Sequence, residues 1–374
     1  MDKRLLALGG IIGFVALAHY FVIDFPNSFQ KVFDEQYYIQ PALNMLNGTR
    51  FTTAMGEASN LEHPFLAKAF IALGILAFGN DATGWRIASI LCGLGCIPLV
   101  YVISKKSLFA TALFSLDSLI FAQSSLGVLD IPMLFFLLLG FALYFRKSYW
   151  LTGIAFALAL LCKETAVLGI AALLIYHVVY SKEKAKGLGY ILLPTFIGAL
   201  VGLQIFDSLF TNFPSALNQM AYILTYASGL KGHSWCMWAV ACTNGPYLNP
   251  LNWITAYYPP GYWVFYFHGV SIGWRGIATL PVIWVGIAAL IIKRKDMELR
   301  FPMIWFAVTY LPYIPIWLTG RNTYPFYFIP AIPALCMAAA SLHPKLASMD
   351  FTRLYQAALL LAALLWFFAT YPLL

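Results

Sequence analysis

Two adjacent acids, Asp34 and Glu35, stand beside two tyrosines, Tyr37 and Tyr38, in the first polar stretch of the sequence. Only 10% of the 374 residues are charged, so a pair of neighbouring carboxylates needs an explanation. A carboxylate at the edge of a membrane can act as a general base that removes a proton from a hydroxyl group. The alternative is a charge pair at the N-terminal end of an amphipathic helix that lies at the membrane interface. Spacing alone leaves both interpretations open.

Lys31, Arg50 and Lys68 could keep such a carboxylate ionised. The further candidate site residues are three cations and a histidine: Lys68, Arg86, Arg321 and His63. A single cation near a helix end is often an anchor whose charged head reaches the membrane surface. Several cations that face a carboxylate are better explained as a seat for an anion such as a phosphate. His63, beside Pro64, is a candidate polar contact in the same site.

Other charged residues fall near the ends of apolar runs, and they have simpler explanations. Asp117 and Asp130 are acids of this kind. Lys163 and Glu164 are expected in the turn between two helices, where each charge offsets the other. No pair of histidines has the spacing of a zinc site, so we predict no metal ligands, and metal dependence stays undetermined.

The composition identifies an integral membrane protein. Hydrophobic residues make up 61% of the chain, and its mean hydropathy is +0.77. A soluble domain of this size would expose more polar surface. Repeated apolar runs of about 18–22 residues, each able to cross roughly 30 Å of hydrocarbon, predict an all-α bundle. The net charge of +8 is spread over short loops, so nucleic acid is not an expected partner.

The apolar runs predict about eleven transmembrane helices. The first, 5–22, is expected to be a retained helix, because no convincing signal-peptide cleavage site follows it. The short run 69–82 is expected to be partly embedded without crossing. The remaining spans are predicted at 84–104, 107–124, 128–145, 149–162, 164–180, 188–206, 271–292, 301–319, 324–341 and 355–372.

The basic residues predict the orientation of these spans. With the N-terminus in the cytoplasm, most of the 23 basic residues fall on the inner side, as the positive-inside rule requires. Eight fall near the outer face: Lys31, Arg50, Lys68, Arg86, Lys163, Lys231, Arg275 and Arg321. This path requires 149–162 and 164–180 to form a tight pair that turns outside at Lys163.

Two long polar segments then lie outside the cytoplasm, at 23–68 and 207–270, within a single domain that spans 1–374. The first carries the acidic pair and is expected to form interfacial helices. The second is rich in Trp, Tyr, Pro and Asn, which argues against a continuous span. Cys236 and Cys242 share this second segment, and loop geometry decides whether they form a disulfide.

An ordered series of motifs resembles the protein O-mannosyltransferase family of C-type glycosyltransferases. It begins with FDEQYY and EHPFLAK, and it continues through GWR, LDSLIFAQSSLGVLDIPMLFF and GIAFALALLCKETA. It resumes with RFPMIWFAVTYLPYIPIW and GRNTYPFYFIPAIPAL, so it covers most of the chain in order. The motif around His63 departs from the family pattern, because Phe65 replaces its usual second proline.

The resemblance implies a membrane bundle that transfers a monosaccharide, such as mannose, from a dolichyl or other polyprenyl phosphate. The acceptor would be a hydroxyl group on a protein, lipid or glycan, and the anomeric carbon would be inverted on the extracytoplasmic face of the cell membrane. Asp34 would be the catalytic base and Glu35 its support. Lys68 and Arg321 would face the lipid phosphate, and Arg86 would hold the loop or the phosphate. Tyr38, in FDEQYY, is assigned to the substrate site with His63.

Two other classes of function stay open in the sequence. A transporter or flippase of lipid-linked sugars would need charged or broken helices at the middle of the membrane, preferably in related halves. The unusual charges of this chain collect instead at the predicted outer face. A non-catalytic membrane subunit is the third interpretation.

In the first interpretation, the enzyme would use the lipid-linked sugar as a substrate, with no separate cofactor and with membrane lipids around it.

Overall fold

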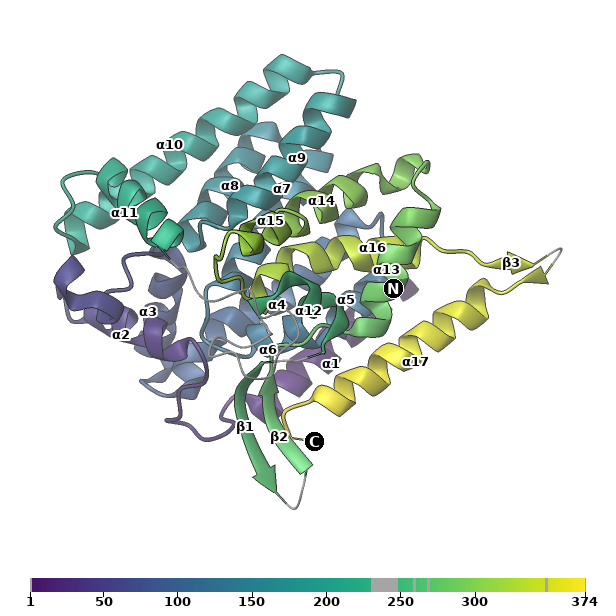
Figure 1. Cartoon of the computed structure of the whole chain (residues 1–374), viewed down its shortest axis with the longest axis horizontal. Coiled ribbons are helices and arrows are strands. Elements are labelled where there is room, and N and C mark those ends of the chain that lie inside the picture. The colour runs from purple at the N-terminus through teal and green to yellow at the C-terminus, as the bar shows by residue number, and fades with distance from the viewer. Residues whose placement is uncertain (1, 230–247, 258–259, 268–269, 347–348, 374) are drawn as a thin grey trace.

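The computed structural model describes residues 2–229, 248–257, 260–267, 270–346 and 349–373, and most of them are helical. The first part of the chain contains the helices α1 (Lys3–Val22), α2 (Glu35–Leu46), α3 (Leu66–Phe78), α4 (Ala82–Ile103), α5 (Leu108–Ser115), α6 (Ser118–Ser124), α7 (Asp130–Phe145), α8 (Tyr149–Cys162) and α9 (Ala166–Tyr180). The second part contains α10 (Lys184–Phe210), α11 (Ala216–Gly229), α12 (Pro250–Thr255), α13 (Leu280–Ile292), α14 (Arg300–Tyr310), α15 (Tyr313–Leu318), α16 (Ile332–Ala340) and α17 (Thr352–Thr370). Figure 1 shows these helices crossing in one bundle. The predicted fold class is therefore confirmed.

Five of the described helices are long and apolar enough to cross a membrane. They are Lys3–Val22, Ala82–Ile103, Ala185–Phe210, Met297–Leu318 and Thr352–Thr370. Six shorter apolar helices accompany them: Leu66–Phe78, Asp130–Phe145, Tyr149–Cys162, Ala166–Tyr180, Leu280–Ile292 and Pro325–Ala340. The protein is thus a multi-pass membrane protein, and the count of eleven spans stays a prediction.

The predicted span 107–124 is wrong as a continuous helix. It is broken into α5 and α6 at Asp117, whose side chain accepts hydrogen bonds from the backbone N–H groups of Leu119 and Ile120 at 3.0 Å. These bonds start a new helix, because a short acceptor side chain satisfies N–H groups that have no partner within the helix. Asp117 also accepts the N–H of Thr279 at 2.9 Å, which ties the break to the start of α13.

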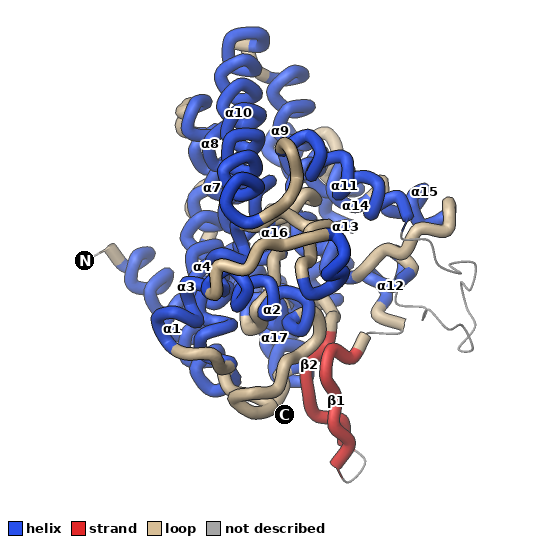
Figure 2. Tube along the Cα trace, turned by 90° about the vertical axis from the view of Figure 1, so that its left-hand side faces the viewer, coloured by secondary structure: helices blue, strands red, loops and turns tan. Residues whose placement is uncertain are grey.

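The predicted span 271–292 is also wrong in its first part. Residues Val270–Arg275 form strand β2, which pairs antiparallel with β1 (Gly261–Phe267), and α13 begins only at Leu280. The sequence of β1, GYWVFYF, is rich in aromatic residues that favour strands. Figures 1 and 2 show this hairpin extending away from the helices. A second, two-residue pair joins β3 (Lys345–Leu346) to β4 (Met349–Asp350).

Two other segments differ from their predicted boundaries. The predicted boundary at 207 falls inside α10, which continues to Phe210. The run 301–319 is divided between α14 and α15, and a 3-10 helix (Pro325–Ala331) precedes α16. The described cysteines, Cys92, Cys96, Cys162 and Cys336, are free thiols, whereas Cys236 and Cys242 lie outside the described residues.

The first polar segment folds onto the start of α4. Helix α2 begins at the acidic pair, as expected, and a 3-10 helix (Thr53–Ala58) follows it. Helices α3 and α4 then pack closely at Gly74 and Gly84. A Cβ atom on Gly84 would overlap the carbonyl oxygen of Gly79 and lie 3.1 Å from the Cα of Ile75. This close approach fixes the start of α4 against the end of α3.

We predict that Gly84→Ala destabilises the protein, because neighbouring backbone atoms would have to move, at a cost of about 1–3 kcal/mol. The melting temperature in detergent measures the effect. Gly189→Ala is the matched control, since nothing lies within 4 Å of a Cβ atom at this position of α10. The control should keep or raise the melting temperature, because alanine favours the helix. An equal loss in both variants would contradict the packing argument.

Candidate active site

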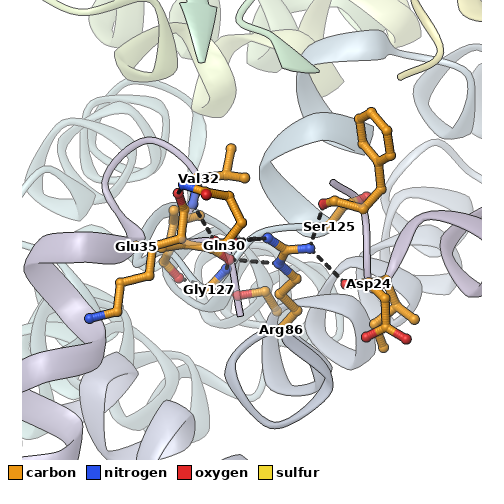
Figure 3. Close-up of polar contacts among 12 residues, drawn as sticks. Asp24, Gln30, Val32, Glu35, Arg86, Ser125 and Gly127 are labelled. Atoms are coloured by element: carbon orange, nitrogen blue, oxygen red, sulfur yellow. Dashed lines mark hydrogen bonds and ion pairs between the residues drawn. The ribbon is translucent and has the colours of Figure 1, made fainter. Parts of the chain in front are cut away.

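The two adjacent acids have different surroundings. Glu35 and Arg86 are fully buried and form an ion pair, with Glu35 Oε1 2.8 Å from Arg86 Nε and Oε2 2.9 Å from Nη2. Figure 3 shows the two side chains facing each other. Glu35 also accepts the backbone N–H groups of Val32 at 2.7 Å and Gly127 at 2.8 Å. Both carboxylate oxygens are therefore occupied.

Arg86 holds the loop before α2 in the same network. Its Nη1 donates to the carbonyl oxygens of Ile23 and Phe25 at 2.7 and 2.8 Å, and its Nη2 contacts that of Gln30 at 3.4 Å. One guanidinium thus joins α4 to the segment that leads into α2. Of the two predicted roles of Arg86, the structure places it in the first, which is to hold the loop.

Asp34 lies on the other side, at the wall of a cavity of about 350 Å³. In the described part of the chain, the one hydrogen bond recorded for its carboxylate comes from the hydroxyl of Tyr38 at 3.5 Å. The cavity is lined by Phe33, Asp34, Tyr37, Tyr38, Asn60, Glu62, His63, Lys163, Glu164, Tyr226, Ala227, Arg321, Tyr324, Phe326 and Tyr327. A volume of this size is typical of a site for a small molecule.

Lys163 and Glu164, in the turn between α8 and α9, line the cavity, and each forms an ion pair with a distant residue. Lys163 Nζ donates to both carboxylate oxygens of Asp130, at 2.9 and 2.8 Å, and lies 4.5 Å from the ring centre of Phe326. His63 Nδ1 lies 3.0 Å from Glu164 Oε2. Burial by itself would raise the pKa of Glu164, but His63 and Lys163 outweigh it and lower that pKa to about 2.

The surroundings of Asp34 make it a weaker acid than usual. Burial raises its pKa from 3.8 to about 6; the nearby charge of Lys163 limits the rise and that of Asp130 adds to it. His63 and the hydroxyl of Tyr38 also favour the ionised form. A carboxylate with a pKa near 6 is ionised at neutral pH and is a stronger base than an ordinary aspartate, which suits proton transfer from a hydroxyl.

The structure brings four of the predicted site residues to one cavity: Asp34, Tyr38, His63 and Arg321. Arg321 Nη1 donates to the carbonyl oxygen of Asn322 at 2.7 Å, and no ion pair is recorded for Arg321 among the described residues. Its charge is therefore available to an anion that enters the cavity.

Lys68 is not brought to the cavity, so the prediction that it faces the phosphate does not match its placement. Its side chain is buried, and Nζ donates to the carbonyl oxygens of Asn60 and His63 and to Asn60 Oδ1. All three donors of the ammonium group are occupied. Lys68 instead holds the turn that places His63 at the cavity.

Lys163 and Glu164 line the cavity and Asp130 pairs with Lys163, although the sequence analysis gave them no such role. Their position in or near a turn was predicted correctly, but the expected pairing of Lys163 with Glu164 is wrong. Lys163 pairs with Asp130 and Glu164 with His63. The signal in the sequence was their charge: two ionisable residues between apolar runs need partners, and the partners lie far away in the chain.

A larger cavity, of about 590 Å³, lies at the other end of α4. The acid at its wall is Glu298, which is exposed and pairs with the exposed Lys105 at 2.8 Å. An exposed carboxylate that is paired and solvated is a poor candidate for a base. The cavity at Asp34 is therefore the stronger candidate for an active site.

Comparison with known proteins identifies similar sequences. Residues 62–207 match the family model of dolichyl-phosphate-mannose-protein mannosyltransferases. An uncharacterized protein of Aquifex aeolicus is 25% identical over 321 residues, which are 82% of this chain and 58% of that protein. A polyprenol-phosphate-mannose–protein mannosyltransferase of Mycolicibacterium smegmatis is 28% identical over 118 residues, which are 30% of this chain and 23% of that protein. The chain thus spans little more than half, or less, of the length of these relatives.

Solved structures share the whole architecture. The Pmt1–Pmt2 protein O-mannosyltransferase complex of Saccharomyces cerevisiae, bound to the sugar donor, matches 100% of this chain and 90% of that chain, with a TM-score of 0.78 and 12% identity. ArnT of Cupriavidus metallidurans bound to undecaprenyl phosphate matches 96% of this chain and 74% of that chain, with a TM-score of 0.56 and 16% identity. These matches show a shared fold.

We predict that Arg86→Met destabilises the protein by about 3–5 kcal/mol, because Glu35 would remain buried without a cation. Thermal unfolding in detergent measures the loss. The control is Glu298→Gln, which breaks the exposed pair with Lys105 and should cost less than about 1 kcal/mol. If Arg86→Met melted no lower than Glu298→Gln, the network around Glu35 would not be holding the loop.

Proposed function

We propose that this chain, as a member of a protein O-mannosyltransferase-like family of C-type glycosyltransferases, transfers a monosaccharide from a polyprenyl phosphate to an acceptor hydroxyl. The observation that carries the proposal is that one of the two adjacent acids has an ion-pair partner and the other has none. Glu35 is neutralised by Arg86, whereas Asp34 faces a cavity with no cation bound directly to it among the described residues. Such a carboxylate is able to accept a proton.

The reaction divides between the two sides of the cavity. Asp34 takes the proton of the acceptor hydroxyl, and the hydroxyl oxygen forms a bond to the anomeric carbon of the sugar. The bond from that carbon to the phosphate oxygen breaks, and its electron pair leaves with the polyprenyl phosphate. A single displacement of this kind inverts the anomeric carbon.

Arg321 is the residue best placed to stabilise the leaving phosphate. Negative charge grows on the phosphate oxygens as the bond breaks, and a fixed cation lowers the energy of that state. Lys163 also lies at the cavity, but both of its contacts to Asp130 compensate its charge. The undecaprenyl phosphate bound to ArnT and the dolichyl-phosphate-mannose named for the family model support a lipid phosphate as the anion.

The identity of the sugar and the side of the membrane are also part of the proposal. They rest on the matching family model and on the charges of the loops. Mannose is the sugar named for the matching family model. Lys163 and Arg321 line the cavity, and the charge distribution of the loops supports an extracytoplasmic position for these residues, with the N-terminus inside. The acceptor is a hydroxyl group on protein, lipid or glycan.

We predict that Asp34→Asn abolishes transfer, with a loss of about 10²–10⁴-fold, because the amide cannot accept the proton. Purified protein, radiolabelled polyprenyl-phosphate mannose and a panel of hydroxyl acceptors provide the assay. Donor binding should persist, since Arg321 remains in place. Full activity of Asp34→Asn would refute the role of the base. Movement of the lipid across vesicles without turnover would indicate a transporter, and neither activity would indicate a non-catalytic subunit.

The raised pKa of Asp34 predicts opposite effects of pH on activity and stability. Activity should fall below a pH of about 6, where the base becomes protonated. Stability should instead decrease as pH rises from about 4 to 6, because the folded protein holds this proton more tightly than the unfolded chain does. Asp34→Asn should therefore melt at a higher temperature than the wild type at pH 7.5, and the difference should vanish at pH 3.5. A lower melting temperature at pH 7.5 would contradict this account.

A further inference from the structure

Phe33, immediately before Asp34, has an unfavourable backbone conformation. Its φ angle is +54°, in the left-handed region that side chains other than glycine rarely adopt. Phe33 also lines the cavity, so the irregular residue is in the wall of the site and directly next to the proposed base. Conformations of this kind persist only where surrounding contacts hold them.

The ring of Phe33 is held by Tyr262, a residue from a distant part of the chain. The two rings are stacked, with centres 3.9 Å apart and planes inclined by 23°. Tyr262 is itself buried, and its hydroxyl accepts a hydrogen bond from Gln123 Nε2 at 2.9 Å. Phe326, another residue of the cavity wall, meets Phe33 edge to face at 5.8 Å.

Tyr262 is also at an irregular position. The strand pairing places Gly261 opposite Arg275 and Trp263 opposite Trp274, so Tyr262 is the extra residue of a β-bulge. A bulge redirects a side chain that regular pairing would place elsewhere, and bulges are frequent beside active sites. Here the bulge in β1 and the left-handed residue before α2 bring their two rings together.

On its other side, the turn at Phe33 is fixed by Glu35. The N–H of Val32 donates to Glu35 Oε2 at 2.7 Å, and the N–H of Glu35 donates to the carbonyl oxygen of Val32 at 3.1 Å. These two hydrogen bonds close the turn that contains Phe33 and Asp34. We infer that the position of the Phe33 ring in this turn sets the direction of the Asp34 side chain.

We propose that Phe33 and Tyr262 are positioning residues that hold Asp34 toward the cavity, so that the β1–β2 hairpin is a working part of the active site. The effect on catalysis rests on the proposed function, whereas the effect on the Asp34 side chain does not. Neither residue needs to touch the reacting atoms. Their contribution is to keep the carboxylate where it can reach the acceptor hydroxyl.

The test is a double-substitution cycle with Phe33→Ala and Tyr262→Ala. Each single variant should lower kcat by about 10–100-fold, as a displaced catalytic group does, with little change in KM for the donor. The double variant should lose no more than the worse single variant, because either change already removes the stack. Tyr262→Phe keeps the ring and should restore most of the activity lost in Tyr262→Ala.

Phe306→Ala is the matched control for the loss of a stacked ring. Phe306 and Tyr310 have ring centres 5.3 Å apart and planes inclined by 18°, and Phe306 does not line the cavity at Asp34. Its loss should lower the melting temperature and leave kcat unchanged. If Phe306→Ala lowered kcat as much as Phe33→Ala, the effect would be one of general stability and the proposal would fail.

Gly276→Ala displaces Tyr262 without altering either ring. A Cβ atom at this position would lie 2.5 Å from the hydroxyl oxygen of Tyr262 and 2.6 Å from the ring carbon that bears it. The variant should lower kcat in the wild-type background and have no further effect in Tyr262→Ala. Loss of activity that is equal in both backgrounds would contradict the proposed route through Tyr262.

Labelling of Asp34 with a hydrophobic carbodiimide, read by mass spectrometry, tests the same proposal without turnover. Phe33→Ala, Tyr262→Ala and Gly276→Ala should each change the rate of labelling by at least about threefold, whereas Phe306→Ala should not. Wild-type protein without transferase activity would refute the proposed function, and the labelling result would still decide this inference. Unchanged labelling in the three variants, together with unchanged kcat in active protein, would overturn it.

Discussion

Glu35 and Arg86 are both fully buried, and either would be costly to bury without the other. The Glu35 carboxylate accepts hydrogen bonds from Arg86 and from the N–H groups of Val32 and Gly127, so both of its oxygens are occupied. The first polar segment is thereby attached to α4 and to the turn before α7. Because Arg86 is fully engaged with Glu35 and with carbonyl groups, it cannot also pair with Asp34. The ion pair of Glu35 therefore leaves Asp34, the proposed base, without this cation.

Other charged residues at the cavity, and Lys68 in the turn that carries His63, also have partners within the protein. Lys163 is compensated by Asp130, Glu164 by His63, and Lys68 by carbonyl groups. A buried charge without a partner is expensive, so the fold compensates its charges locally. For Asp34, Glu62 and Arg321, which also line the cavity, no ion pair is recorded in the described ranges; Glu62 accepts a hydrogen bond from Asn60 Nδ2 at 3.0 Å. In the proposed reaction, Asp34 without an ion-pair partner suits the acceptor hydroxyl, and Arg321 without one suits the phosphate.

Much of this fold could be predicted from the sequence, because one physical cause, the hydrocarbon layer, produces long apolar helices such as α1 and α4. The hairpin was missed because β1 has no charged residue and β2 has only Arg275 at its end, so the polar–apolar alternation that identifies a strand is weak. The acids at 34 and 35 were found by their charge. Their separate roles, and the partners of Lys163 and Glu164, depend on contacts between residues up to 101 positions apart, which spacing does not reveal.

The irregular backbone at Phe33 shows how such distant contacts act on the site. A left-handed residue of this size costs about 1–3 kcal/mol, which the surrounding contacts must offset. Tyr262, outside the segment that matches the family model, contacts Phe33 directly. Arg86 and Gln123, within that segment, act through Glu35 and Tyr262. Asp34 itself precedes that segment. The acidic motif therefore reaches its working geometry only when the hairpin, more than halfway along the chain, has folded against it.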